Sequence, residues 1–89
     1  MSERQLRRSP QALWRRADTE VVATLPEAED IQELGGAAAA VWLGLDEPTS
    51  TAGLIRLLAE GYAMEPDVIA GDVEVAVAEL VLVGLVMET

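Results

Sequence analysis

Carboxylates are the only abundant side chains in this sequence that could carry out acid–base chemistry. The 89 residues include 16 Asp and Glu but no Cys and no His, which removes thiolate nucleophiles, Ser-His triads and most zinc or iron ligand sets. Because acids are so numerous, pairs of carboxylates arise by chance and none stands out as a catalytic pair. We therefore expect no enzymatic activity, no metal site and no cofactor, with a small carboxylate enzyme as an open alternative.

One serine could carry a covalent group. Ser50 lies near the predicted start of a helix, as does the serine that takes the phosphopantetheine arm in acyl and peptidyl carrier proteins. In those proteins an Asp usually precedes the serine and a Leu follows it, whereas Ser50 lies between two threonines. The strand-like first third of the chain also does not suit an all-helical carrier. A carrier-like protein is therefore kept as an alternative function.

The distribution of charge limits the possible partners. The net charge is −10, and five of the six arginines lie within the first 16 residues. From residue 17 onward, 15 acids face a single basic residue, Arg56. A body of this sign repels phosphate backbones, so we expect a neutral or basic partner and no nucleic acid. An acidic surface that only keeps a small protein soluble would give the same charge.

Size and hydrophobicity indicate one small soluble domain. A chain of this length buries only about 60–65% of the surface exposed by its unfolded form, which leaves little room for a deep pocket. No apolar run approaches 18 residues and none follows the N-terminal arginines, so we predict neither a membrane span nor a signal peptide, and a cytoplasmic location. Since aromatics make up only 3% of the sequence, we expect Trp14, Trp42 and Tyr62 to be the large pieces of the core.

Three short strand-like runs occupy the first part of the chain. Residues 1–8 are polar and basic, and we expect them to form a flexible arm. The runs QALWRR, EVVATL and DIQEL follow, separated by turn-forming residues, and predict an antiparallel meander. In the third run, Ile31 and Glu33 share one face while Gln32 and Leu34 share the other. The pattern does not say which pair faces the core.

Three helices are predicted after the strands. The first covers about residues 36–45, the second is capped by Ser50 or Thr51, and the third starts at Pro66 and ends at Gly84. Its β-branched residues would also suit a strand, but its acids and its apolar spacing favour a helix. The helix would bury Ile69, Val73, Ala76 and Leu80. These elements predict an α+β fold, a small domain of winged helix-turn-helix type with a three-stranded antiparallel sheet followed by three helices.

The order and spacing of several segments resemble the PqqD-like family, the recognition domains of ribosomally made and later modified peptides. The segments are RSPQALWRR, GAAAAVW, Pro48, LIRLLAEGY, DVEVAVAEL and VGLV, and the resemblance assigns residues 9–89 to a PqqD-like domain. Many relatives have Thr-Gly or Asn-x-Thr-Gly where this chain reads GGAAA. The subfamily is therefore left open.

The resemblance implies a non-catalytic peptide-binding protein. In the family, the leader segment of a precursor peptide adds as a strand to the third strand, in a groove beside the third helix, and a modifying or protease enzyme then acts on the peptide. Carried over to this chain, the site would comprise Ile31, Gln32, Glu33 and Leu34 with Val68, Asp72, Val75 and Glu79. The two acids on the helix would complement a basic leader residue and the two valines an apolar one.

Other interpretations stay open for the same residues. The helix stripe that includes Asp72 and Glu79 could equally be a solvated face. A winged helix that binds DNA is a weaker alternative, because its recognition helix needs Arg and Lys and residues 57–89 contain none. The oligomeric state is undetermined, and Leu57, outside the expected core stripe of its helix, is a conceivable surface for self-association.

Overall fold

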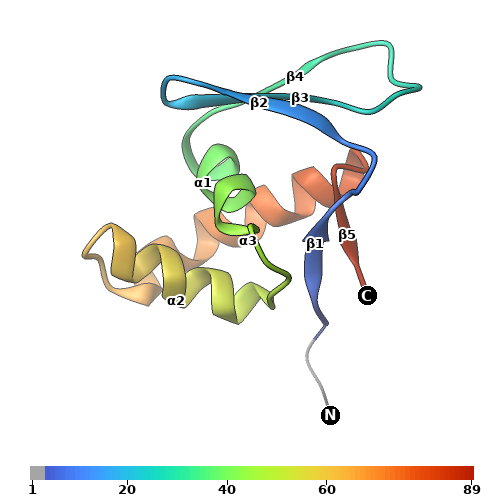
Figure 1. Ribbon diagram of the computed structural model, residues 1–89. Helices are drawn as coiled ribbons and strands as arrows, with labels where there is room; N and C mark the ends of the chain where they lie inside the picture. Colours follow the sequence, from blue (N-terminus) through green and yellow to red (C-terminus); the bar gives the residue numbers. More distant parts are fainter. Residues whose placement is uncertain (1–3) are drawn as a thin grey trace.

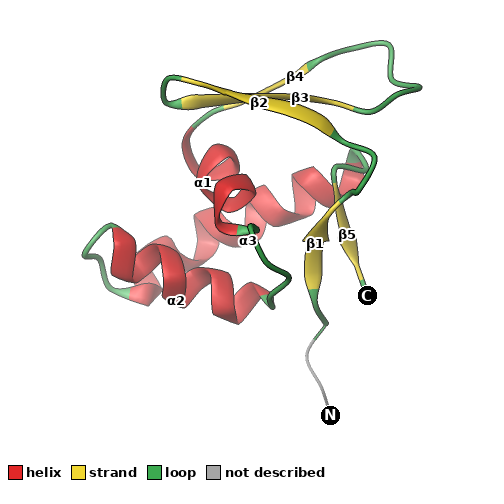
Figure 2. Cartoon of the chain, viewed as in Figure 1, coloured by secondary structure: helices red, strands yellow, loops and turns green. Residues whose placement is uncertain are grey.

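The fold consists of a three-stranded sheet, three helices and a separate two-stranded sheet (Figures 1 and 2). The computed structural model describes residues 4–89. In chain order the elements are β1 (Leu6–Arg8), β2 (Leu13–Ala17), β3 (Glu20–Thr24), β4 (Gln32–Leu34), α1 (Gly36–Gly44), α2 (Thr51–Gly61), α3 (Pro66–Leu82) and β5 (Val86–Glu88). The predicted α+β class is confirmed, as is the antiparallel meander followed by three helices.

The meander pairs its strands in the order β2-β3-β4, and the helices lie on one side of it (Figure 1). A two-residue turn at Asp18 and Thr19 joins β2 to β3, with Ala17 opposite Glu20. Asp18 adopts a φ of 60°, the left-handed conformation that such tight hairpin turns need and that Asp tolerates better than most residues. This turn fixes the register of β2 against β3.

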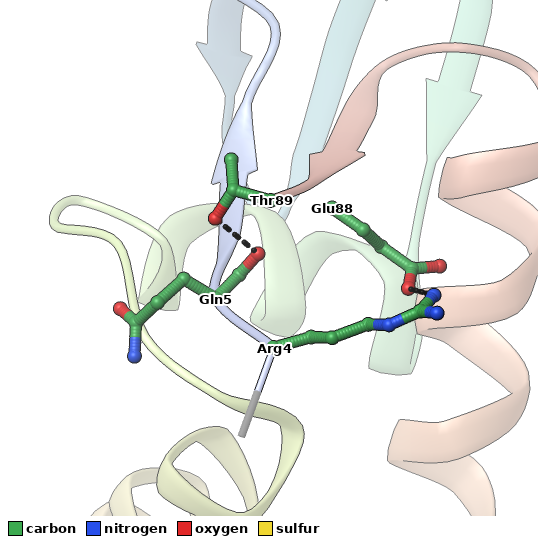
Figure 3. A network of polar contacts seen from close by, with 4 residues as sticks. All are labelled: Arg4, Gln5, Glu88 and Thr89. Carbon is green, nitrogen blue, oxygen red and sulfur yellow. Dashed lines mark hydrogen bonds and ion pairs between the residues drawn. The ribbon is translucent and has the colours of Figure 1, made fainter. Parts of the chain in front are cut away.

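The N-terminal segment is a strand from Leu6 onward, so the prediction of a flexible arm is wrong for residues 6–8. Leu6 is buried and lies opposite Glu88, and its backbone also exchanges two hydrogen bonds with Thr49. Arg4 adds an ion pair to Glu88 at 2.9 Å (Figure 3). The local pattern could not indicate this, because the partner strand β5 lies some 80 residues away. Residues 1–3 lie outside the described part of the chain.

Local hydrogen bonds define the ends of the second and third helices. The Ser50 hydroxyl accepts a hydrogen bond from the Gly53 amide at 3.0 Å, which caps α2 as predicted. After α3, Gly84 has a φ of 83°. The amides of Gly84 and Leu85 then bond back to carbonyls in the last turn, 3.0 Å each, in the arrangement known as a Schellman motif. Gly84 therefore ends α3 and turns the chain into β5.

The core lies between the meander and the helices, and Trp42 is its largest fully buried side chain. The predicted core positions Val73, Ala76 and Leu80 are buried on α3, while Ile69 is only partly buried. Two expected core residues are not in the core: Trp14 is 40% exposed and Tyr62 is 60% exposed.

The exposure of these two aromatic residues has a structural reason. Trp14 lies on the edge strand β2, where its ring meets Trp42 edge-on with centroids 5.8 Å apart and no further strand of the described residues covers it. Tyr62 follows the last residue of α2. Because the helix ends before this position, Tyr62 does not continue the buried face of the helix. Apolar spacing alone does not reveal where a helix stops covering the core.

Candidate functional site

One open edge of the meander lies at β4, and the other lies at β2. Among residues 4–89, β4 pairs only with β3, so its other side presents unpaired backbone groups. Leu34 lies opposite Val21 and is 6% exposed, and Gln32 on the same face is half-buried. Ile31 is 64% exposed and Glu33 is exposed as well. Gln32 and Leu34 therefore face the helices, which settles the question that the alternation left open.

The hairpin register also identifies which backbone groups of β4 are free. With only two residues in the turn, Ala17 and Glu20 form the first hydrogen-bonded pair, and hydrogen-bonded and non-bonded pairs then alternate along both strands. In β3, the even-numbered residues direct their backbone groups to β2. Val21 and Ala23 must therefore direct theirs to β4.

The same alternation applies to the strand at the edge. Gln32 and Leu34 lie opposite Ala23 and Val21, so their N–H and C=O groups bond to β3. Glu33, between them, directs its N–H and C=O away from the sheet. The open edge thus presents one donor and one acceptor at Glu33, spaced to receive another strand.

A hollow of about 400 Å³ lies beside this edge, between β4 and the C-terminal half of α3. It brings together the predicted site residues on β4 and Glu79 on α3, but Ile31 is not among its walls. Its lining consists of Gln32, Glu33, Leu34, Gly35, Ala38, Glu79, Leu80, Leu82 and Val83. We refer to it as the edge hollow.

A second hollow of about 380 Å³ continues from the first along α1 and α3, and we refer to it as the middle hollow. The two share Gly35, Ala38 and Glu79. Asp72 and Val75 add to its α3 wall, while small residues of α1 form the opposite wall. Three of the four helix positions predicted for the site are thus joined to β4. Val68, 62% exposed, lies outside both hollows.

Two apolar residues of the site were not predicted from the sequence. Leu82 is 85% exposed and Val83 is 42% exposed, and both line the edge hollow. The signal was available in the helical spacing, because one further turn from Glu79 along the same stripe reaches positions 82 and 83. The predicted stripe ended at Glu79, one turn before these two residues.

The two hollows are acidic as well as apolar. Asp72 and Glu79 line them from α3, Glu33 borders the edge hollow from β4 with its side chain on the exposed face, and no Arg is among the lining residues. Within the described residues, no group of Asp and Glu is arranged to hold a metal ion, and no helix is long and apolar enough to cross a membrane. The arrangement suits binding of an extended chain that carries apolar and basic side chains.

Arg8 positions α1, which forms one wall of the middle hollow. Its guanidinium donates to the carbonyls of Trp42 and Leu43 at 2.8 and 3.2 Å, in the last turn of the helix. It also lies 4.7 Å from the ring centroid of Trp14 and 5.4 Å from that of Trp42. Burial lowers the pKa of Arg8, and the nearby Asp46 carboxylate opposes this shift. The positive charge of Arg8 stabilises the negative C-terminal end of α1, whose last turn has no basic residue of its own.

The carrier-protein alternative loses its key residue in the structure. Ser50 is only 7% exposed, and its hydroxyl serves as the cap of α2. A phosphopantetheine arm needs an accessible hydroxyl, which this position does not provide.

Comparison with known proteins agrees with the geometry. The family model described as coenzyme PQQ synthesis protein D (PqqD) matches residues 20–86. Among solved structures, TbiB1 in complex with the TbiA(beta) leader peptide has a TM-score of 0.76, with 16% identity over 90% of this chain and 93% of that one. A search of curated proteins finds no match. Since the family model covers most of the chain, this protein belongs to the PqqD family.

Proposed function

We propose that this chain is a non-catalytic recognition domain that binds the leader segment of a ribosomally made precursor peptide and presents it to a modifying or processing enzyme. The observation that carries the proposal is the open edge of β4, with the backbone of Glu33 directed outward beside a hollow that continues onto α3. Family membership supports it, as does the fold shared with TbiB1, which was solved with a leader peptide.

Binding would occur by addition of a strand. A peptide residue opposite Glu33 exchanges two backbone hydrogen bonds with it, so an antiparallel peptide becomes the fourth strand of the meander. The neighbouring peptide residues on either side then share the face of Gln32 and Leu34. Their side chains point into the edge hollow, toward Leu82 and Val83. Backbone bonds supply affinity for any extended chain, and the hollow selects its side chains.

Charge supports the choice of peptide. The hollows carry the carboxylates of Asp72 and Glu79 on α3, which favour leader segments with Lys or Arg. Binding the leader to a domain that also contacts the enzyme would raise the concentration of substrate at the active site without any chemistry by this chain.

A pair of proline substitutions tests the proposal. Glu33→Pro removes the outward N–H, and proline is tolerated where a strand N–H faces solvent. The same hairpin register directs the backbone of Arg16 away from the sheet at the opposite edge, on β2, so Arg16→Pro is the matched control. Gln32→Pro is unsuitable because that amide bonds to β3.

We expect Glu33→Pro to weaken binding of the leader peptide about tenfold or more, because the loss of one backbone bond costs about 1 kcal/mol and the ring obstructs the approaching strand. Arg16→Pro should bind as the unchanged chain does. Isothermal titration calorimetry with a synthetic candidate leader peptide measures both. A folded Glu33→Pro variant with unaltered affinity would refute strand addition at β4.

A further inference from the structure

A third hollow, of about 300 Å³, lies at the corner where α2 turns into α3. Its walls come from the start of α1, the end of α2 and the first turns of α3, and include Tyr62, Met64 and Ile69. It shares Ala37 and Asp72 with the middle hollow. We call this third hollow the corner hollow. Because neighbouring hollows share lining residues, the three together line a path from the edge of β4 to the corner.

The corner hollow differs chemically from the rest of the path. Asp72 is the only charged residue in its lining, and it lies on the border with the middle hollow. Tyr62 is 60% exposed and Met64 is 44% exposed, so two large apolar side chains border an opening that nothing in the described chain fills. A volume of this size accommodates one large apolar side chain.

The direction and length of the path determine what would reach the corner. In an antiparallel pair, the part of the peptide N-terminal to the residue opposite Glu33 runs toward Gly35 and then along α1 and α3. From Leu82 to Ile69 the path follows 13 residues of α3, about 20 Å at 1.5 Å per residue. An extended chain covers that length with about six residues.

We propose that the corner hollow binds an apolar side chain of the leader peptide, about six residues N-terminal to the residue that pairs with Glu33. A basic residue between these two positions lies against Asp72 and Glu79, the acids on the wall of the middle hollow. This inference rests on the proposed function and adds a sequence requirement to it. The protein would recognise three features of the leader, in order from its N-terminus: an apolar anchor residue, a basic residue and a segment that pairs with β4.

The alanines of α1 fit this role. Ala37 and Ala38 are half-buried and line the middle hollow opposite the longer side chains of α3. A larger residue at either position would fill the path, whereas alanine leaves space for a chain to pass. The small residues thus serve both close packing of the two helices and an open channel beside them.

The test uses synthetic peptides with the sequence of a candidate leader, shortened one residue at a time from the N-terminus. The affinity of the peptides for this protein should fall in two steps. Removal of the apolar anchor should weaken binding about tenfold, and removal of residues in the pairing segment should abolish the remaining binding. A single step at the pairing segment would overturn the inference and leave strand addition intact. No binding by any full-length leader would contradict the proposed function itself.

Variants of the protein locate the anchor. Met64→Ala should weaken binding of the full-length leader about three- to tenfold and leave the shortened peptide unaffected. Leu57→Ala is the matched control, since Leu57 is 49% exposed on α2 and lines none of the three hollows. Equal affinity of the two variants for the full-length leader would overturn the assignment of the corner hollow. Both side chains are exposed, so neither truncation opens a cavity in the core.

A second pair of variants tests the charge. Asp72→Asn should weaken binding of the full-length leader about two- to fivefold, and this loss of affinity should decrease at high salt. Glu74→Gln removes an equal charge from an exposed position on the same helix, outside the three hollows, and should change little. Equal effects of the two would show a general charge effect and overturn the role assigned to Asp72.

The absence of cysteine from the sequence allows a direct measurement of position. A fluorophore on Met64→Cys should change its emission when the full-length leader binds but not when the shortened peptide binds. The same fluorophore on Leu57→Cys should respond to neither. A response to the shortened peptide at Met64→Cys would contradict the proposed length of the path.

Discussion

Replacing Arg8 should destabilise this domain far more than replacing its neighbour in the same strand. The Arg8 side chain is 17% exposed, and its guanidinium donates to two carbonyls at the end of α1 and lies over two tryptophan rings. Removing it leaves carbonyls of the last helical turn without a donor and opens space beside the rings of Trp14 and Trp42. The link between β1 and α1 would then depend on apolar contacts alone.

The expected loss can be estimated from these contacts. A hydrogen bond from a charged donor contributes about 1.5–3 kcal/mol and a partly desolvated cation–π contact about 0.5–2 kcal/mol, with strong overlap between terms that share one side chain. We therefore expect Arg8→Ala to lower the free energy of unfolding by about 2–4 kcal/mol. Arg8→Lys keeps the charge but not the planar guanidinium with its forked donors, so it should lower the free energy of unfolding by about half as much.

Urea unfolding followed by tryptophan fluorescence measures this directly, because the two tryptophans of the sequence are the two rings beside Arg8. Arg7→Ala removes an exposed arginine of the same strand and should stay within about 0.5 kcal/mol of the unchanged chain. The loss at Arg8 should persist in salt, since its ion pair with Asp46 is long, 3.9 Å, and Asp46 is 91% exposed. A loss below about 0.5 kcal/mol for Arg8→Ala would refute this account of how α1 is held.

Two backbone positions should respond in opposite directions. Ala63 has a φ of 54° in the turn after α2, where its amide and that of Met64 bond back to α2; Ala63→Gly relieves this conformation and should raise the unfolding free energy by about 1 kcal/mol, seen as a higher melting temperature in calorimetry. Gly84 has a φ of 83°, and a Cβ there would lie 3.3 Å from Cδ1 of Leu25, so Gly84→Ala should lower the unfolding free energy by about 1–2 kcal/mol in urea titrations. A lower melting temperature for Ala63→Gly, or no change for Gly84→Ala, would contradict the backbone argument at that position.

Elements with strong local signals were predictable from the sequence. The cap at Ser50, the proline at the start of α3 and the glycine after it all act within one turn of the chain, so their residue types reveal them. The helical state of α3 followed from apolar residues three and four apart, against its β-branched content. The meander followed from short runs bounded by turn residues.

Features that depend on distant partners were not predictable. Strand β1 pairs with β5, and neither strand has enough residues to show an alternating pattern by itself. The inward face of β4 depends on its register with β3, which is reached across the loop of residues 25–31 and is not set by a tight turn. In the candidate site, the family resemblance selected the residues and alternation and helical spacing grouped them, but only the packing of α1 against α3 shows that Val68 lies apart from the hollows and that Leu82 lines one of them.

The most direct test of the central claim is hydrogen exchange at two neighbouring amides, measured by NMR with and without the leader peptide. The Gln32 amide bonds to β3 and should be protected in both states, whereas the Glu33 amide faces outward and should exchange quickly until the peptide covers it. Strand addition at β4 predicts that saturating peptide slows hydrogen exchange of the Glu33 amide by at least tenfold, with little change in the exchange rate of the Gln32 amide. An unchanged rate at Glu33 in a saturated complex would show that the peptide binds elsewhere and would contradict the account.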